Sequence, residues 1–306
     1  MPDNINWFPG HMRRALNDTK ALLPQVDMVI ETADARIPFS SRNPELEQII
    51  GGKPRLVVLN KADLADPEKT KLWEEFLSSD NAAVLPLDSV HRKGVEKISK
   101  ICENLCRDIL EKADSKGRVG RPVRAMVVGV PNTGKSTLIN ALAGKKSAVT
   151  GNKPGVTREP KWAKTQGRLE LMDMPGVLWP KIQSRRMGVC LSATGAIKDE
   201  INDLESIAFD TMKMLNDLYP ALMEARYKVN IEEIKSQTAD DEYGYSDADY
   251  DVFLAMAKGA GCVKSGGVAD EERFSRVLLD DLRSGRIGRI SLEIPIAKGD
   301  SYGTQN

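Results

Sequence analysis

Residues 129–137, GVPNTGKST, restrict the fold of this chain more than any other segment. They match the pattern G-x-x-x-x-G-K-[ST], follow the apolar run 125–128 and precede the helical pattern of residues 138–142. A strand–loop–helix unit of this kind holds phosphates with backbone N–H groups and with the positive end of the helix. A glycine- and lysine-rich turn without a ligand is the weaker alternative, because both flanking elements are present. The residues expected at the nucleotide are Asn132, Thr133, Gly134, Lys135, Ser136 and Thr137.

A second short motif predicts which base is bound. Asn60, Lys61, Ala62 and Asp63 match N-K-x-D and directly follow the apolar run 55–59. The Asp63 carboxylate can accept hydrogen bonds from both N1–H and the N2 amine of guanine. Adenine lacks that amine and presents a lone pair at N1, which would leave the carboxylate without a donor. We therefore expect GTP and GDP rather than ATP, with a backbone N–H at Ser89 directed at guanine O6.

Two further motifs predict how Mg²⁺ and the γ-phosphate are held. Asp173 and Gly176 form D-x-x-G after the apolar run 169–172, which places the carboxylate near Mg²⁺ and the Gly176 N–H near the γ-phosphate. Thr157, in the polar loop 152–159, fits a threonine that ligates Mg²⁺ only when the γ-phosphate is present. Ser136, Thr157 and Asp173 are thus the expected Mg²⁺ ligands. Together the motifs predict a GTPase.

The order of the motifs is circularly permuted, because the base-reading elements precede the phosphate-binding loop. Alternating short apolar runs and helical patterns predict a mostly parallel sheet with helices on both faces. Residues 95–112 are expected to form one helix with Cys102 and Cys106 on its core face. Beyond residue 180 only helical patterns remain. We therefore expect an N-terminal arm (1–15), a permuted P-loop GTPase domain (16–180) and an all-α C-terminal domain (181–306).

Composition restricts the cell compartment and the partners. The formal net charge is zero, which excludes a globally basic nucleic-acid binder, although basic residues outnumber acidic ones between residues 141 and 190. Such a stretch can bind a phosphate backbone or can simply be a solvated surface. No apolar run is long enough to span a bilayer, and the N-terminus resembles neither a signal nor a transit peptide. Four scattered cysteines and two histidines argue for reduced thiols, no zinc site and a cytoplasmic protein.

Three segments, together with the permuted order, resemble the ribosome-biogenesis GTPase A family of circularly permuted GTPases. They are residues 7–12 (WFPGHM), 34–38 (DARIP) and 288–291 (GRIS), and the resemblance covers essentially the whole chain. It implies a cytoplasmic factor that acts late in maturation of the large (50S) ribosomal subunit and leaves after GTP hydrolysis. It also implies that the ribosome stimulates hydrolysis and that the helical domain contacts rRNA. Nothing in the sequence suggests an oligomer, so we expect a monomer.

The group that orients the attacking water is not given by the GTPase motifs. Val177 stands where small GTPases carry a glutamine, and a valine side chain cannot form a hydrogen bond. The resemblance points to His11 as the catalytic group, with a docking role as the alternative. Asn132 resembles the asparagine with which related GTPases hold K⁺, so Mg²⁺ and K⁺ are the expected cofactors. The alternative function is a GTP-dependent switch that recruits a protein and does not act on the ribosome.

Overall fold

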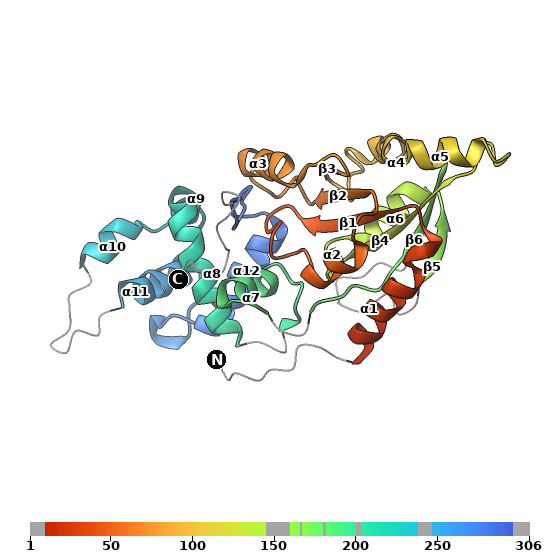
Figure 1. The fold of residues 1–306 in the computed structure, drawn as a ribbon. Coiled ribbons are helices and arrows are strands. Elements are labelled where there is room, and N and C mark those ends of the chain that lie inside the picture. The colour runs from red at the N-terminus through yellow and green to blue at the C-terminus, as the bar shows by residue number, and fades with distance from the viewer. Residues whose placement is uncertain are drawn as a thin grey trace. The chain divides into compact units, whose positions relative to one another are not determined.

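The structure is a computed structural model of the 306-residue chain, and it describes residues 10–144, 160–165, 167–179, 182–199, 203–237 and 247–295. The chain divides into two compact units. The first comprises Met1–Arg185 together with Glu293–Asn306, and the second comprises Arg186–Leu292. The first unit contains the sheet and the second is helical (Figure 1).

The first unit is built on a six-stranded sheet with the strand order β3-β2-β1-β4-β6-β5. All neighbouring strands pair in parallel except β5 and β6, which are antiparallel. The strands are β1 (Met28–Asp34), β2 (Arg55–Asn60), β3 (Ala82–Leu87), β4 (Val123–Gly129), β5 (Lys161–Lys164) and β6 (Leu169–Asp173). The predicted mostly parallel sheet is therefore confirmed.

Two strands are polar over much of their length. Strand β1 continues past its apolar first half to Asp34. Its second half contains the polar residues Glu31, Thr32 and Asp34, so no apolar run indicates it, yet all three residues are buried within the sheet. Strand β5 was not predicted, because the strand is only four residues long (Lys-Trp-Ala-Lys) and most of these residues are exposed. Charged residues on a short edge strand discourage pairing with another chain.

Helices cover both faces of this sheet. They are α1 (Gly10–Leu22), η1 (Leu23–Gln25), α2 (Pro44–Ile50), α3 (Pro67–Leu77), η2 (Val95–Lys97), α4 (Ile98–Leu105), α5 (Arg107–Asp114) and α6 (Lys135–Ala143). Strand β2 shows why both faces need cover: Leu56 and Val58 join one apolar cluster, whereas Val57 and Leu59 join another. A strand that is apolar on both faces must be buried on both.

The prediction of a single helix over residues 95–112 is wrong. The segment consists of η2, α4 and α5, and the backbone leaves helical geometry at Cys106 (φ −102°, ψ 14°). Cys102 and Cys106 are nevertheless both buried in the same apolar cluster, as the pattern indicated. Helical spacing of apolar residues reports which side chains face the core, and a short break that preserves that face leaves the spacing unchanged.

The chain returns to the first unit at Glu293. The Glu293 carboxylate accepts hydrogen bonds from the Phe39 N–H (2.7 Å), the Ser40 N–H (3.1 Å) and the Ser40 hydroxyl. Its backbone carbonyl accepts one from the Trp73 indole N–H (3.2 Å). The helical unit therefore ends at Leu292, whereas the expected helical domain extended to residue 306.

The second unit contains α7 (Arg185–Ala193), α8 (Leu204–Leu218), α9 (Pro220–Tyr227), α10 (Ile231–Gln237), α11 (Ala248–Gly259), η4 (Ser265–Gly267) and α12 (Glu271–Ser284). Its aromatic core stacks Phe274 edge-on against Tyr227 and Phe253, with ring centroids 5.3 and 4.9 Å apart. Helix α12 starts at the N-cap Asp270 and stops at Gly285, whose φ of 76° suits a residue without a side chain. The described part of this unit contains no β-strand, in agreement with the predicted all-α region.

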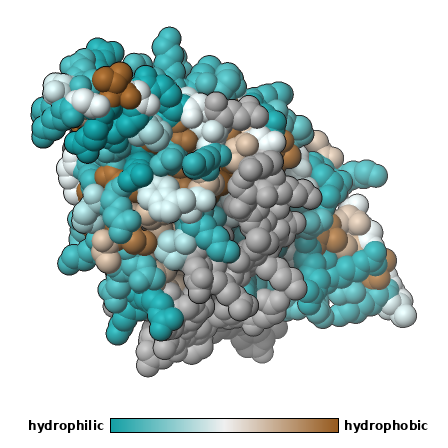
Figure 2. Space-filling model, turned by 90° about the vertical axis from the view of Figure 1, so that its right-hand side faces the viewer, coloured by the Kyte–Doolittle hydropathy of each residue, from teal (hydrophilic) through white to brown (hydrophobic). Residues whose placement is uncertain are grey.

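Hydrophobic residues are dispersed over the visible surface. The face shown in Figure 2 is mostly hydrophilic, with hydrophobic residues in small separate groups. None of the helices in the described ranges has both the length and the apolar character that crossing a bilayer requires.

We expect Trp73→Ala to lower the free energy of unfolding by about 3–5 kcal/mol, because it empties a large core volume and removes the donor to Glu293. Trp73 is fully buried, whereas its neighbour Leu72 on α3 is 47% exposed. Urea denaturation should therefore show a change within about 0.5 kcal/mol for Leu72→Ala. Equal effects of the two substitutions would contradict the packing described for α3.

Candidate nucleotide-binding site

The predicted phosphate-binding loop joins the carboxyl end of β4 to the start of α6, where ligands of parallel sheets bind. Two positions of the loop have no room for a side chain and therefore require glycine. A Cβ on Gly134 would lie 2.1 Å from the Asn60 amide nitrogen, and one on Gly129 would lie 2.4 Å from the Thr32 carbonyl oxygen. Asn132 adopts a left-handed φ of 61°, which asparagine tolerates better than most residues. The loop is thus tightly packed against β1 and β2.

Lys135 is almost completely buried, with 7% of its surface exposed. Its ammonium group donates to the carbonyl oxygens of Val130 (2.8 Å) and Gly129 (3.1 Å). Burial lowers the pKa of Lys135 to about 8, although the nearby Asp173 carboxylate acts in the opposite direction. An ammonium group held within the loop is placed to bind phosphate oxygens.

Asn60 connects the base-reading motif to the phosphate-binding loop. Its amide nitrogen donates to the Thr133 carbonyl at 2.7 Å, and its amide oxygen accepts the Ser89 N–H at 3.1 Å. The Ala35 N–H donates to its backbone carbonyl at 2.8 Å. Three of the predicted site residues are therefore brought together by one buried side chain. The Ser89 N–H, which we had expected at guanine O6, is used here by Asn60.

The base-reading loops form an oxygen-rich edge. Asp63 is exposed, whereas Asp88 is buried and accepts hydrogen bonds from the N–H groups of Val90 (2.9 Å) and His91 (3.0 Å). The imidazole Nδ1 of His91 lies 2.6 Å from the Asp88 carboxylate. One ligand atom from each of Asp63, Asp88 and His91 lies within 4.8 Å of the others. The exposed Asp63 carboxylate suits the N–H donors of guanine, and the spacing of the three groups is compatible with a cation.

Asp34 is a site residue that the sequence analysis missed. Its buried carboxylate accepts hydrogen bonds from Arg36 Nε (2.9 Å) and the second Arg36 guanidinium nitrogen (2.8 Å), and from Lys61 Nζ (2.8 Å). Burial alone would raise the pKa of Asp34, but Arg36 and Lys61 together hold it well below its usual range. The backbone of Lys61 has a left-handed φ of 60°. The available signal was the charged pair of Asp34, the last residue of β1, and Arg36.

The second-switch motif lies beside the phosphate-binding loop. Asp173 ends β6, which pairs with β4, and beyond it the Val177 N–H donates to the Gly129 carbonyl at 3.2 Å. A Cβ on Gly176 would lie 2.9 Å from Lys135 Nζ, so this glycine is packed against the loop lysine. The buried carboxylate of Asp173 and the hydroxyl of Ser136 are hard oxygen ligands of the kind that Mg²⁺ takes. The donor set fits that ion.

Two predicted residues cannot be placed at the site. Thr157 lies outside the described residues. His11 belongs to the first turn of α1, but its side chain is outside the described part of the structure, as are Trp7 and Phe8. Val177, at the position of the missing glutamine, is buried.

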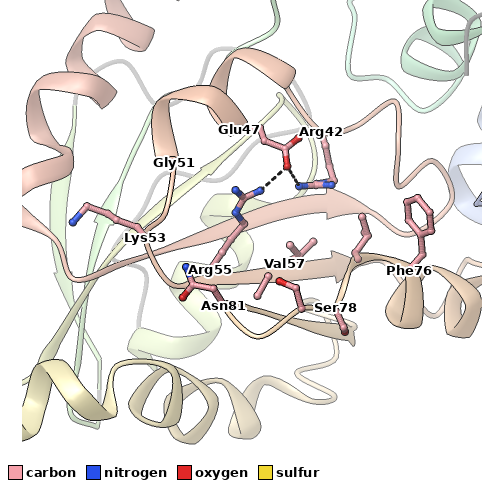
Figure 3. A pocket seen from close by; sticks show the side chains of 12 residues that line it. Arg42, Glu47, Gly51, Lys53, Arg55, Val57, Phe76, Ser78 and Asn81 are labelled. Atoms are coloured by element: carbon pink, nitrogen blue, oxygen red, sulfur yellow. Dashed lines mark hydrogen bonds and ion pairs between the residues drawn. The ribbon is translucent and has the colours of Figure 1, made fainter. Parts of the chain in front are cut away.

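A pocket of about 330 Å³ lies at the opposite edge of the sheet, where β2 and β3 begin (Figure 3). Arg42 and Arg55 point toward Glu47 from one wall, and each also pairs with the buried Glu31, at 3.0 and 3.4 Å. This charged network ties α2 and the segment before it to β1 and β2. None of the predicted site residues lines the pocket, so it is separate from the nucleotide site.

Comparison with known proteins gave three kinds of match. The family model described as "50S ribosome-binding GTPase" matches residues 124–249. Ribosome biogenesis GTPase A of Bacillus cereus is 40% identical over 97% of this chain and 96% of its own length. The protein of that name from Bacillus licheniformis is 40% identical over 95% of this chain and 98% of its own. The crystal structure of GNP-bound YlqF from T. maritima superimposes with a TM-score of 0.62 at 25% identity, covering 92% of this chain and 98% of that one.

The lowered pKa of Lys135 predicts that GDP affinity falls above pH 8. Below about pH 8 the ammonium is charged before and after binding, whereas above it the free protein must take up a proton to bind phosphate. The dissociation constant should then rise by up to about tenfold between pH 8 and 9. Calorimetric titration at pH 7, 8 and 9 measures this. Lys135→Arg keeps its charge over that range and should show no such rise; the same slope in both proteins would argue against Lys135.

Proposed function

The chain belongs to the ribosome biogenesis GTPase A family and is a GTPase, and from this premise we propose that it acts in late maturation of the large (50S) ribosomal subunit. Hydrolysis of GTP would be slow in the free protein and stimulated by the particle. The names of the relatives support the ribosomal part of this proposal. The observation that supports nucleotide binding is the Asn60 amide, which joins the N-K-x-D motif to the phosphate-binding loop.

Each part of the site has a role in this proposal. Asp63 accepts the guanine N–H groups, and the loop around Asn132 and Lys135 holds the phosphates. Ser136, Thr157 and Asp173 would hold Mg²⁺, and the Gly176 N–H would meet the γ-phosphate. When bound, the ion supplies charge neutralisation at the phosphates. Thr133, Gly134 and Thr137 complete the loop, and Lys61, Ala62 and Ser89 complete the base site.

Two groups are proposed to trigger hydrolysis. Val177 is buried and cannot orient water, and, following the family resemblance, we assign that role to His11, in the first turn of α1. Asn132 would ligate K⁺, whose charge would act where other GTPases use an arginine. The helical unit, Arg186–Leu292, would contact rRNA. We propose that the protein works in the cytoplasm as a monomer.

The proposal predicts that large-subunit particles raise the rate of GTP hydrolysis, and more so in K⁺ than in Na⁺. His11→Ala should lower the stimulated rate by about 10²–10⁴-fold, as loss of a proton-transfer group does, while GDP affinity stays unchanged. Asn17→Ala, an exposed substitution on the same helix, is the control. A stimulated rate that survives His11→Ala would remove the catalytic assignment, and equal rates in the two salts would remove the K⁺ site.

Co-sedimentation separates the ribosomal function from the protein-recruiting alternative. Binding to large-subunit particles with a non-hydrolysable GTP analogue is expected, and it should weaken as salt rises because phosphate contacts release counterions. If the protein stays in the supernatant at low salt with the analogue bound, the ribosomal proposal is wrong.

Exchanging the carboxylate of Asp63 for an amide should change the base that is bound. Xanthine carries a carbonyl oxygen at C2 in place of the guanine amine, so the amide of Asp63→Asn can donate to it while still accepting N1–H. We expect GTP affinity to fall about 10–100-fold, which corresponds to a bidentate contact of about 1–3 kcal/mol, and XTP affinity to rise. Competition binding measures both. Asp80→Asn, in the exposed turn before β3, should alter neither.

A further inference from the structure

We propose that Asn43 positions the second-switch segment for GTP hydrolysis by holding the backbone of Val177. The side-chain amide nitrogen of Asn43 donates to the Val177 carbonyl oxygen at 3.1 Å, and Asn43 is 1% exposed. The backbone N–H of Val177 donates to the Gly129 carbonyl at 3.2 Å. The backbone directly after Gly176 is therefore held from both sides, by the phosphate-binding loop and by Asn43.

The amide of Asn43 has only one consistent orientation. Its oxygen accepts the Glu45 N–H at 2.9 Å and so forms the N-cap of α2. Because the oxygen is used by the helix, the nitrogen faces Val177, where a carbonyl oxygen needs a donor. The preceding residue, Arg42, pairs with the buried Glu31 at 3.0 Å and also lies beside Glu47 (Figure 3). Asn43 is thus fixed by its neighbours as well as by its own contacts.

Residues 34–43 connect this contact to the base-reading motif. At the first end of this segment, the Asp34 carboxylate accepts a hydrogen bond from Lys61 Nζ. The backbone N–H of Asp34 donates to the Ser41 hydroxyl at 2.9 Å. The Ser41 hydroxyl donates in turn to the Ile37 carbonyl at 2.7 Å. At the other end stands Asn43. One buried, internally bonded loop therefore holds both the N-K-x-D motif and the segment that follows Gly176.

The contact should matter for the γ-phosphate and not for the rest of the nucleotide. Gly176 is packed against Lys135 and Pro131, and it is the group we have proposed for the γ-phosphate. This inference rests on that proposed placement. If the Val177 backbone loses its clamp, Gly176 loses its fixed position, but the guanine and the first two phosphates keep all their partners. GDP binding should therefore be insensitive to Asn43.

Asn43→Asp tests the role with a minimal change. Aspartate caps a helix as well as asparagine does, so α2 keeps its cap, but the carboxylate cannot donate to the Val177 carbonyl. We expect the intrinsic kcat for GTP and the affinity for a non-hydrolysable GTP analogue each to fall about tenfold, with GDP affinity within about twofold of the unsubstituted protein. Asn43→Ser also keeps a capping hydroxyl and loses the reach to Val177, and it should behave in the same way.

The reverse exchange at another N-cap is the matched control. Asp66 caps α3 by accepting the Glu68 and Lys69 N–H groups, so Asp66→Asn makes the opposite exchange of amide and carboxylate at an N-cap that does not contact the segment after Gly176. It should leave all three measurements unchanged. If the two Asn43 variants hydrolyse GTP normally, or lose GDP and analogue affinity equally, the inference is wrong.

Gly176→Ala separates this inference from the placement on which it rests. The added Cβ would crowd Lys135 and Pro131, and it should lower analogue affinity more than GDP affinity if Gly176 serves the γ-phosphate. A selective loss in Gly176→Ala without one in Asn43→Asp would reject Asn43 alone. No selective loss in Gly176→Ala would reject the placement of Gly176 itself. All of these measurements use the free protein and need no ribosome.

Discussion

The nucleotide site depends on one buried amide, that of Asn60. Its nitrogen holds the Thr133 carbonyl of the phosphate-binding loop, and its oxygen holds the Ser89 N–H of the second base loop. A buried polar side chain that satisfies both partners fixes their separation, because breaking either bond would leave an unpaired group away from water. Two loops that follow different strands are therefore held at a fixed spacing. Gly134 completes the arrangement, since any side chain there would occupy the space of this amide.

Charge pairs in the interior keep the surrounding loops in place. Asp34 between Arg36 and Lys61, and Glu31 between Arg42 and Arg55, bury carboxylates that would be costly without cations. The first group includes Asp34 and Arg36, at the start of residues 34–43, and the second includes Arg42, at their end. Between them, the Glu293 carboxylate binds the backbone of Phe39 and Ser40. The segment that leaves the helical unit is thus attached to the same loop that contacts the base motif and the second switch.

The permuted order gives this loop its importance. Because the D-x-x-G strand is the last strand of the sheet in sequence, the chain passes from Gly176 toward the helical unit and comes back at Glu293. The segment after Gly176 is held to residues 34–43 through Asn43, and the returning segment is held through Glu293. Both connections are therefore anchored within the first unit. A change at the proposed γ-phosphate position would therefore act on this buried loop.

The sequence by itself determined the sheet, the phosphate-binding loop and the guanine motif, because each depends on local patterns: apolar runs that predict strands and short motifs at their carboxyl ends. The tertiary structure decided what depends on contacts between distant residues. The carboxylates in the polar half of β1 are buried against arginine and lysine side chains from the segment that follows β1, from the start of β2 and from the residue after its end, and the helix expected over residues 95–112 breaks at Cys106 while keeping its buried face. The roles of Asn43 and Glu293 could not be recognised, since their partners Val177 and Phe39 lie 134 and 254 positions away along the chain, whereas Asp34 gave a local signal in its pairing with Arg36.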